Sequence, residues 1–309
     1  MTKLTVLTYN IRGDFWSREA TLGLARIVKE REIDVICLQE VCKRFNSHKE
    51  NSHDILSELK VALGGEYEDF AFLPVQCPTM SAGTAIVYRK SLLVPVGDPY
   101  MKHFPLMSAR KPYEEWINGY MAPMRRMIMT EGFRMGSRML IVYCAHLDYF
   151  GGDNRRIYQI NHMFNLWGDR RNGDEICEVL AGDFNTWMPY KLIGLYRRFG
   201  KLRKWLQKKG IREASSKVWW THNFDQVEAD AFEKEGKLQL GLLGKIIRQF
   251  NHSFRQKEDY IWYGGKGMHM VECERIDVNW SDHYPVIAKF SIEETDASSG
   301  TPLGGSGRA

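Results

Sequence analysis

Short, almost wholly apolar runs recur along this chain, and each of them ends abruptly in polar residues. The runs at 34–38 and 178–181 show little alternation between apolar and polar side chains. A strand of this kind must be covered on both of its faces, as happens inside layered α/β folds. Amphipathic helical patterns separate the runs, for instance at 17–30. The pattern predicts an α/β protein with two mixed β-sheets packed face to face and helices outside.

Capping and turn residues place the other elements along the sequence. Ser17 suits the N-cap of a helix, Gly64 suits the end of another, and Gly136 suits the turn of a hairpin. We expect strands at 4–10, 34–38, 70–73, 83–89, 127–131, 138–145, 178–181, 259–263 and 285–292, and helices at 17–30, 55–63 and 154–167.

Composition narrows the class of protein. The chain has 309 residues, of which 44% are hydrophobic, so it can bury a substantial core. It contains no apolar run of the roughly 20 residues that a membrane helix needs, and no pattern of a secretory signal, so we expect a cytoplasmic protein. The six cysteines are scattered without metal-ligand spacing, which favours buried free thiols.

Positive charge is concentrated in one segment of the chain. Residues 187–257 contain sixteen Lys and Arg but only six Asp and Glu. Pro189 suits a first helical turn, and apolar residues at helical spacing predict a basic helix that ends at Gly210. A second amphipathic pattern covers 238–254. We therefore expect one domain at 1–293 with a basic helical insertion at about 187–257, followed by a disordered tail at 294–309.

Polar side chains suited to phosphate chemistry follow the apolar runs in a fixed order. Taken singly, each has a plain structural explanation, such as a turn, a cap or a salt bridge. Together they would leave several buried carboxylates without partners, which is costly. The simplest explanation is that they converge at one rim of the sheets and share a divalent cation and a phosphate group. They are Asn10, Glu40, His146, Asp183, Asn185, Asp259, Asp282 and His283.

These motifs resemble those of the endonuclease/exonuclease/phosphatase superfamily, which has the deoxyribonuclease-I-like fold. The Gly-Asp-Phe-Asn motif at 182–185 and the Ser-Asp-His motif at 281–283 are the most specific. The resemblance implies a four-layer α/β sandwich that hydrolyses phosphate esters with Mg²⁺, or with Mn²⁺ in its place. It also implies that Glu40 binds the metal ion, with Asn10 beside it and Asp282 as a further ligand.

The same resemblance implies roles for the remaining residues. Asp183 would position or deprotonate the attacking water, and Asn185 would hold that water or the phosphate. His283, oriented by Asp259, would contact the scissile phosphate, and His146 would face the phosphate from the other side. Water attacks directly in this scheme, so we expect no covalent intermediate.

Other polar residues carry weaker signals. Arg156 and Gln159 match an Arg-x-x-Gln pattern of some branches of the family, which would let them bind substrate, although a solvated helix face explains Arg156 equally simply. Arg12 stands where some abasic-site nucleases of the family carry an aspartate, which argues against that activity and against a second metal ion at that position. Arg125 and Arg126 precede a strand and could reach substrate, although a surface position is the simpler expectation.

The substrate must be inferred from the loops, because the family acts on both nucleic acids and lipids. Lys201, Arg203 and Lys204 of the basic helix favour nucleic acid, and we expect a DNA endonuclease. Four nearby tryptophans could stack on bases. An equally simple alternative is that Trp205 and the leucines of the helix belong to the core and the lysines form a solvated face. If the segment at 238–254 instead lies on a membrane, a phospholipid or phosphoinositide is the substrate. A non-catalytic binding protein is a third hypothesis, although every expected catalytic position is filled. The tryptophans are Trp187, Trp205, Trp219 and Trp220.

Overall fold

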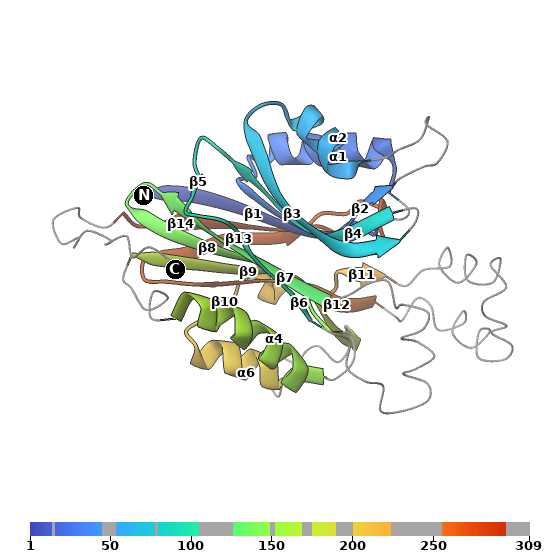
Figure 1. Ribbon diagram of the computed structural model, residues 1–309. Coiled ribbons are helices and arrows are strands. Elements are labelled where there is room, and N and C mark those ends of the chain that lie inside the picture. The colour runs from blue at the N-terminus through green and yellow to red at the C-terminus, as the bar shows by residue number, and fades with distance from the viewer. Residues whose placement is uncertain are drawn as a thin grey trace, which may run out of the picture.

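Two mixed β-sheets pack face to face in the computed structural model of the chain (Figure 1). Helices α1 and α2 cover the outer face of one sheet, and helices α4 and α6 cover the outer face of the other. This arrangement confirms the predicted α/β sandwich. The structure describes residues 1–13, 16–44, 54–77, 80–104, 126–148, 152–168, 175–189, 200–223 and 255–294.

The first sheet has six strands in the order β13-β14-β1-β2-β4-β3. Its central strand β1 runs parallel to β2, while all the other neighbouring strands are antiparallel. Strand β1 also pairs with β14 from the far end of the chain, with Thr2 opposite Ile292. The strands are β1 (Thr2–Asn10), β2 (Val35–Arg44), β3 (Tyr67–Cys77), β4 (Met80–Arg89), β13 (Met268–Arg275) and β14 (Val286–Ile292).

The second sheet has the strand order β10-β12-β9-β8-β7-β5, with β11 paired to β12 and β6 paired to β7. Its parallel pair is β8 and β9, and α4 lies between them in the sequence. The strands are β5 (Val94–Pro95), β6 (Tyr100–Phe104), β7 (Arg126–Met135), β8 (Arg138–His146), β9 (Ile176–Pro189), β10 (Arg212–Glu213), β11 (His222–Asn223) and β12 (Arg255–Gly264).

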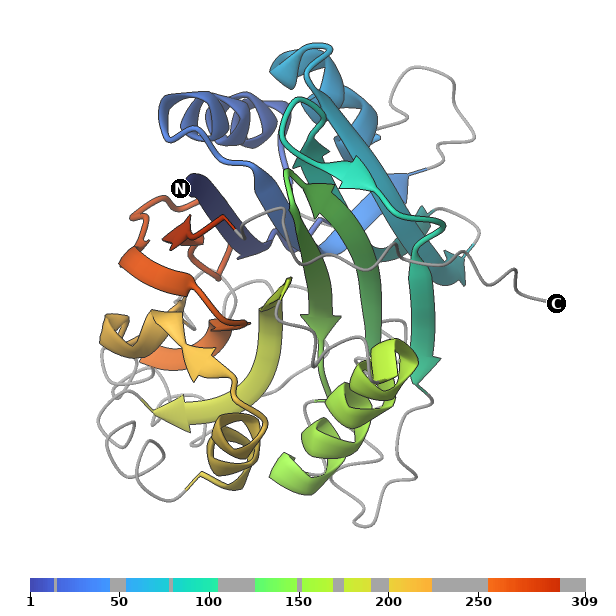
Figure 2. The same ribbon diagram turned by 90° about the vertical axis from the view of Figure 1, so that its left-hand side faces the viewer.

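Local sequence signals mark the start of α1 and the end of α2. The Ser17 side chain accepts a hydrogen bond from the backbone of Ala20 at the start of α1, and Gly64, with a φ of 84°, follows the last turn of α2. Helices α4 and α6 lie side by side (Figure 2). The helices are α1 (Arg18–Glu30), α2 (Ile55–Leu63), α4 (Gly152–Trp167) and α6 (Lys201–Lys208), with a 3-10 turn η3 (Ala214–Lys217).

Three apolar layers hold the sandwich together. The central layer lies between the sheets and includes Leu4 and Phe133. A second layer packs α1 and α2 on the first sheet through residues such as Leu24. The third packs α4 and α6 on the second sheet, with Ile160 and Leu206 among its buried side chains. Both sheets are therefore covered on both faces, which accounts for the continuous apolar runs.

Several sequence predictions need correction or fall outside the described residues. Pro189 is the last residue of β9, opposite Gln256 of β12, and not part of a helical turn. Strand β13 was not predicted, because its sequence mixes exposed and half-buried residues. The predicted helix from 191 is described only as α6, and the segments at 238–254 and 295–309 lie outside the description. None of the described helices is long and apolar enough to cross a membrane.

Candidate active site

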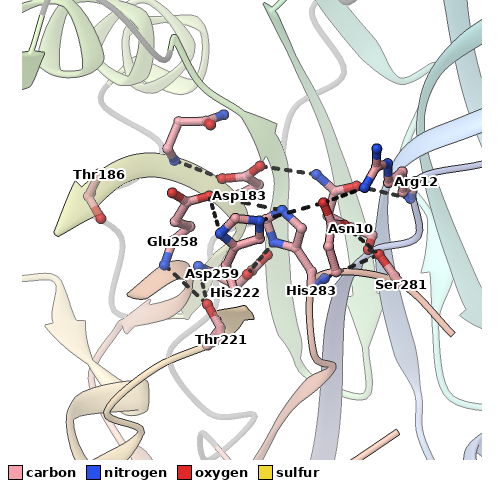
Figure 3. Close-up of polar contacts among 12 residues, drawn as sticks. Asn10, Arg12, Asp183, Thr186, Thr221, His222, Glu258, Asp259, Ser281 and His283 are labelled. Carbon is pink, nitrogen blue, oxygen red and sulfur yellow. Dashed lines mark hydrogen bonds and ion pairs between the residues drawn. The ribbon is translucent and has the colours of Figure 1, made fainter. Parts of the chain in front are cut away.

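The predicted catalytic and metal-binding residues meet at one rim of the sandwich, where β1 and β8 end. Figure 3 shows Asn10, Asp183, Asp259 and His283 among them. Hydrogen bonds and ion pairs link all eight of them into one cluster. Asn10 comes from β1, Glu40 from β2, His146 from β8, Asp183 and Asn185 from β9, Asp259 from β12, and Asp282 and His283 from the segment before β14.

A β-bulge places Glu40 in the site. The pairing of β2 with β4 shifts at this residue, and its φ of 55° lies in the left-handed region. Nδ2 of Asn10 donates a hydrogen bond to Oε1 of Glu40 over 3.2 Å. Burial, reinforced by the negative charge of Asp282, raises the pKa of Glu40 to about 7. A carboxylate in these surroundings is stabilised when a cation binds beside it.

A tight turn in β9 fixes Asp183. Its Oδ1 accepts a hydrogen bond from the backbone N–H of Asn185 over 2.7 Å, and its Oδ2 accepts one from Nδ2 of Asn10 over 3.1 Å. Gly182 has a φ of 148°, and a Cβ there would lie 1.9 Å from the carbonyl oxygen of Ala145, so the turn requires glycine. Burial raises the pKa of Asp183, which makes its carboxylate a better proton acceptor.

Asp259 orients His283. Nδ1 of the histidine ring lies 2.8 Å from Oδ2 of Asp259, which leaves Nε2 free to face the site. Burial alone would lower the pKa of His283, but the charge of Asp259 and this hydrogen bond outweigh it and raise the pKa well above its usual range. The ring is therefore a cation near neutral pH, held at a fixed angle by its partner.

Two further residues, Glu258 and His222, complete this side of the site, and neither was predicted from the sequence. Glu258 lies where the pairing of β12 with β9 shifts, opposite the four positions 184–187 of β9 that the pairing skips. Its Oε2 lies 3.9 Å from Nε2 of His283 and 3.9 Å from Nδ1 of His222. Glu258 gave no usable signal, because successive side chains of a regular strand point to opposite faces and it would then face away from Asp259. His222 gave none, because it does not follow one of the predicted strands.

Asp282 lies between two basic side chains. Its Oδ2 is 3.1 Å from a guanidinium nitrogen of Arg12 and 3.5 Å from Nε2 of His222. Burial would raise the pKa of Asp282, but the contact with His222 and the surrounding positive charge hold it well below its usual range. Arg12 thus supplies a fixed positive charge next to this carboxylate, and metal binding by Asp282 stays a prediction.

His146 contacts Arg126 at the opposite side of the site. Its Nε2 is close to the Arg126 guanidinium and lies 3.7 Å from Oε1 of Glu40 and 3.6 Å from Oδ2 of Asp183. Burial, together with the charge of Arg126, lowers the pKa of His146 well below its usual value, so the ring is neutral. The expectation of a surface position for Arg126 is wrong, because its side chain is buried beside this ring. Arg125 lies outside the described residues.

Arg156 and Gln159 are buried on the inner face of α4 and bind backbone atoms. A guanidinium N–H of Arg156 donates to the carbonyl oxygen of Asn185, and Oε1 of Gln159 accepts from the backbone N–H of Asp148 over 3.1 Å. Arg156 does not lie on a solvated helix face, because only 4% of the residue is exposed. Both residues support the loops that follow β8 and the turn of β9, while substrate binding by either one stays a prediction.

The basic residues of α6 lie on its outer side. Lys201 and Lys204 are exposed and Arg203 is half-buried, whereas Leu202 and Leu206 pack into the core. Nζ of Lys201 donates to Asn154 over 2.9 Å, which places it beside the start of α4. Trp205 stacks on Phe164 with ring centroids 5.8 Å apart, so it belongs to the packed layer under the helix.

Acidic side chains outnumber basic ones in the site. A phosphate would add further negative charge, so the cluster needs additional positive charge before it can bind one. Glu40 offers carboxylate oxygens of the kind that Mg²⁺ prefers, whereas Asn10 turns its amide nitrogen toward Glu40 while its Oδ1 accepts from the backbone N–H of Arg12, so metal binding by this pair stays a prediction. The five carboxylates are those of Glu40, Asp183, Glu258, Asp259 and Asp282, and the four basic groups are those of Arg12, Arg126, His222 and His283.

The fold agrees with comparisons to known structures. An endonuclease/exonuclease/phosphatase from Bacteroides vulgatus superposes with a TM-score of 0.58 at 16% identity, over 95% of this chain and 100% of the other. D. rerio TDP2 in complex with a single-strand DNA product gives 0.55 at 14% identity, over 94% and 100%. The human Nocturnin catalytic domain with a bound sulfate anion gives 0.55 at 15% identity, over 94% of each chain.

Sequence comparison adds the assignment that these distant structural similarities cannot make alone. No curated protein sequence matches the chain. The sequence pattern of one family, however, matches residues 7–283, from within β1 to the Ser-Asp-His motif. Members of this family are generally hydrolases, and the fold is that of its phosphoesterases. The chain belongs to the endonuclease/exonuclease/phosphatase family.

Proposed function

We propose that the protein is a Mg²⁺-dependent phosphodiesterase that cuts DNA as an endonuclease. One observation carries the proposal: a buried carboxylate that can accept a proton, Asp183, lies in the same cluster as a cationic histidine, His283. The first can activate water and the second can bind the phosphate that this water attacks. The Glu40 and Asn10 pair beside them is suited to a metal ion.

Asp183 is the residue that prepares the water. Its two oxygens accept hydrogen bonds from Asn185 and Asn10, so the carboxylate cannot rotate away from its position. A raised pKa brings its basicity closer to that needed to take a proton from water at neutral pH. Neutral His146, 3.6 Å from the same carboxylate, adds no competing positive charge.

His283 and the metal-binding pair stabilise the phosphate. The His283 ring presents Nε2 to the site because Asp259 holds Nδ1, and its positive charge lowers the energy of the extra negative charge on the phosphoryl oxygens. Glu40 and Asn10 would hold Mg²⁺, which supplies Lewis-acid stabilisation of a phosphate oxygen when bound. Asn185, whose Nδ2 donates a hydrogen bond to the carbonyl oxygen of Leu147, would stay close to the attacking water.

The choice of DNA as substrate rests on charge and on related structures. Lys201 and Lys204 present exposed ammonium groups on α6, next to the start of α4. Such groups contact a polyanionic backbone without reading its sequence. Among the structurally similar proteins, TDP2 is seen with a single-strand DNA product and Nocturnin with a sulfate anion. These complexes support an anion site and a nucleic-acid partner in this chain as well.

The test is Mg²⁺-dependent hydrolysis of four substrates: supercoiled plasmid, single-stranded DNA, RNA and phospholipid vesicles. Each assay includes an EDTA control and the Asp183→Asn variant, with thermal melting to confirm that the variant folds. Nicking of the plasmid that requires Mg²⁺ and Asp183 supports the proposal. Release of head groups from vesicles without cleavage of any nucleic acid would replace it with a lipid phosphodiesterase, and no hydrolysis of any substrate would favour a binding protein.

A further inference from the structure

Two adjacent tryptophans, Trp219 and Trp220, lie at the border of the catalytic cluster. They come shortly before strand β11, which begins at His222. His222 pairs with His283 across a β-bridge, and the centroids of the two rings are 4.6 Å apart (Figure 3). The tryptophans are thus placed directly outside the site that the proposed function uses.

Trp220 packs against cationic and aromatic side chains from other segments. The guanidinium carbon of Arg255, at the start of β12, lies 4.3 Å from the centroid of its ring, and that of Arg275, at the end of β13, lies 3.4 Å from it. Tyr284, the residue after His283, meets the same ring edge-on, with the centroids 4.9 Å apart. Guanidinium groups that stack on an indole are attracted to its face and keep a fixed geometry. Trp220 therefore joins this border of the site to both sheets.

The positive charges of the two arginines are balanced differently. Arg275 is partly buried, and its guanidinium forms an ion pair with Asp277. Arg255 is exposed, and within the residues that the structure describes no carboxylate forms an ion pair with it. Lys217, which ends η3 just before Trp219, is exposed as well. The charge of Arg255 is therefore available to an anionic ligand, whereas that of Arg275 is largely neutralised.

Trp219 differs from the packed tryptophans because much of its ring lies at the surface. It is 55% exposed, whereas Trp262 of β12 is 1% exposed and belongs to the core. An exposed indole next to the Trp220–Arg255 pair combines a flat apolar surface with a positive charge. These two features suit a single-stranded nucleic acid, because every base has a face that can stack and every linkage carries a negative charge. The catalytic cluster itself is rich in carboxylates and offers no such surface.

We propose that Trp219 and Arg255 form a binding site for single-stranded DNA next to the catalytic cluster. One base stacks on Trp219, and Arg255 contacts a phosphate of the same strand. The inference rests on the proposed function, because it specifies the form of the DNA that this site accepts. A base can stack on a side chain only after it has left its own stack, which costs free energy in a duplex. Single-stranded or locally unpaired DNA is therefore preferred to an intact duplex.

The experiment measures binding of a labelled single-stranded oligonucleotide and of its duplex by fluorescence anisotropy over a range of salt concentrations. EDTA is present, so the readout does not depend on hydrolysis. The variants are Trp219→Ala, the conservative Trp219→Phe, and Arg255→Gln. The matched control is Tyr158→Ala, because Tyr158 of α4 is 56% exposed and has the guanidinium carbon of Arg155 5.3 Å from its ring centroid.

We expect Trp219→Ala to weaken single-strand binding by about tenfold without changing its salt dependence, and Trp219→Phe to keep most of the affinity. Arg255→Gln should also weaken binding and should lower the slope of log affinity against log salt by about 0.7. The unmodified protein should bind the duplex more weakly, and Trp219→Ala should not change duplex binding. Tyr158→Ala should bind both forms as the unmodified protein does.

Unchanged single-strand affinity in Trp219→Ala, or equal losses for single strand and duplex, would overturn the stacking site, and an unchanged salt slope in Arg255→Gln would overturn the phosphate contact. Melting temperatures check that each variant folds. Should Trp219→Ala fail to fold, photo-cross-linking of an iodouracil-containing oligonucleotide to the unmodified protein decides the matter, because a cross-link at Trp219 is then required. Plasmid nicking with unchanged binding in both variants contradicts this inference alone. Single-strand binding through Trp219 without hydrolysis contradicts the proposed function alone.

Discussion

Two glutamates, one from each sheet, enter the active site where strand pairing is irregular, and their surroundings differ. Glu40 adopts a left-handed backbone, keeps 15% of its side chain exposed and accepts a hydrogen bond from Asn10. Glu258 is almost completely buried, and the Thr221 hydroxyl holds its backbone. Burial raises the pKa of both carboxyl groups to about 7. Glu40 is therefore accessible to substrate and metal, whereas Glu258 is enclosed among histidines.

Replacing the two glutamates one at a time is the most direct way to break this comparison. We expect Glu40→Gln to reduce Mg²⁺-dependent turnover by about 10³-fold, since it removes the main oxygen ligand of the proposed Mg²⁺ ion. Glu258→Gln should reduce turnover by about 10–100-fold, the usual effect of a supporting group at a metal site. Initial rates of plasmid nicking, with melting temperatures as a control, measure both. A larger loss in Glu258→Gln than in Glu40→Gln would mean that Glu258 contributes more to turnover than Glu40 does.

Asp259, which orients His283, offers a test confined to the side of the site where Glu258 lies. Asp259→Asn preserves the shape of the side chain but removes the charge that orients the histidine and keeps it protonated. We expect a loss of about 10²-fold in turnover and little change in substrate affinity, since the group acts mainly in the transition state. Steady-state kinetics on a short oligonucleotide separate these effects. A rise in KM with unchanged turnover would contradict this role.

A weaker effect is expected on the basic surface of α6, away from both glutamates. Reversal of Lys201, Arg203 and Lys204 to Glu should weaken binding of long DNA by about tenfold and flatten its dependence on salt. Hydrolysis of a small phosphodiester should stay unchanged, because these groups lie outside the catalytic cluster. Arg203 lies 3.6 Å from Glu213, so its reversal is also tested singly for stability. Unchanged DNA binding would mean that α6 is only a packing element.

The smallest effect on activity is expected at a buried carboxylate outside the site. Burial raises the pKa of Glu131 to about 7 from 4.5. The folded protein therefore holds this proton more tightly than the unfolded chain does, and stability falls as the pH rises from 4.5 to 7. Glu131→Gln should remove that fall, which amounts to about 3 kcal/mol, and leave hydrolysis unchanged. Denaturant unfolding at several pH values measures it, and parallel pH curves for both proteins would refute the expectation.

The sequence predicts the layers of this fold well, and the reason is physical. Continuous apolar runs need cover on both faces, which leaves few arrangements other than stacked sheets and helices. Capping residues such as Ser17 and Gly64 then mark helix ends locally. Strand β13 escapes because its edge position leaves its side chains half-exposed, with no periodic pattern to detect. Pro189 misleads because a proline suits the end of a strand as well as the start of a helix.

The sequence predicts only part of the site. Residues at strand ends, such as Asn10 and His146, are visible because polar groups interrupt an apolar run. Glu258 is hidden, because regular alternation along β12 would place it on the opposite face from Asp259. His222 and Arg126 become site residues only through pairing between distant segments. Inference from the ends of apolar runs therefore recovers even the bulged residue Glu40, and it misses the residues that only pairing between distant segments brings to the site.

The pairing of β1 with β14 also constrains how the protein can be made. Asn10 enters the site near the start of the chain, and its carbonyl oxygen accepts a hydrogen bond from Ser281, 271 positions later. Strand β1 has no partner on its β14 side until residues 286–292 leave the ribosome. A nascent chain thus carries an exposed strand edge throughout most of its synthesis, which invites aggregation or chaperone binding. It also cannot complete its catalytic cluster before translation of the domain is nearly finished.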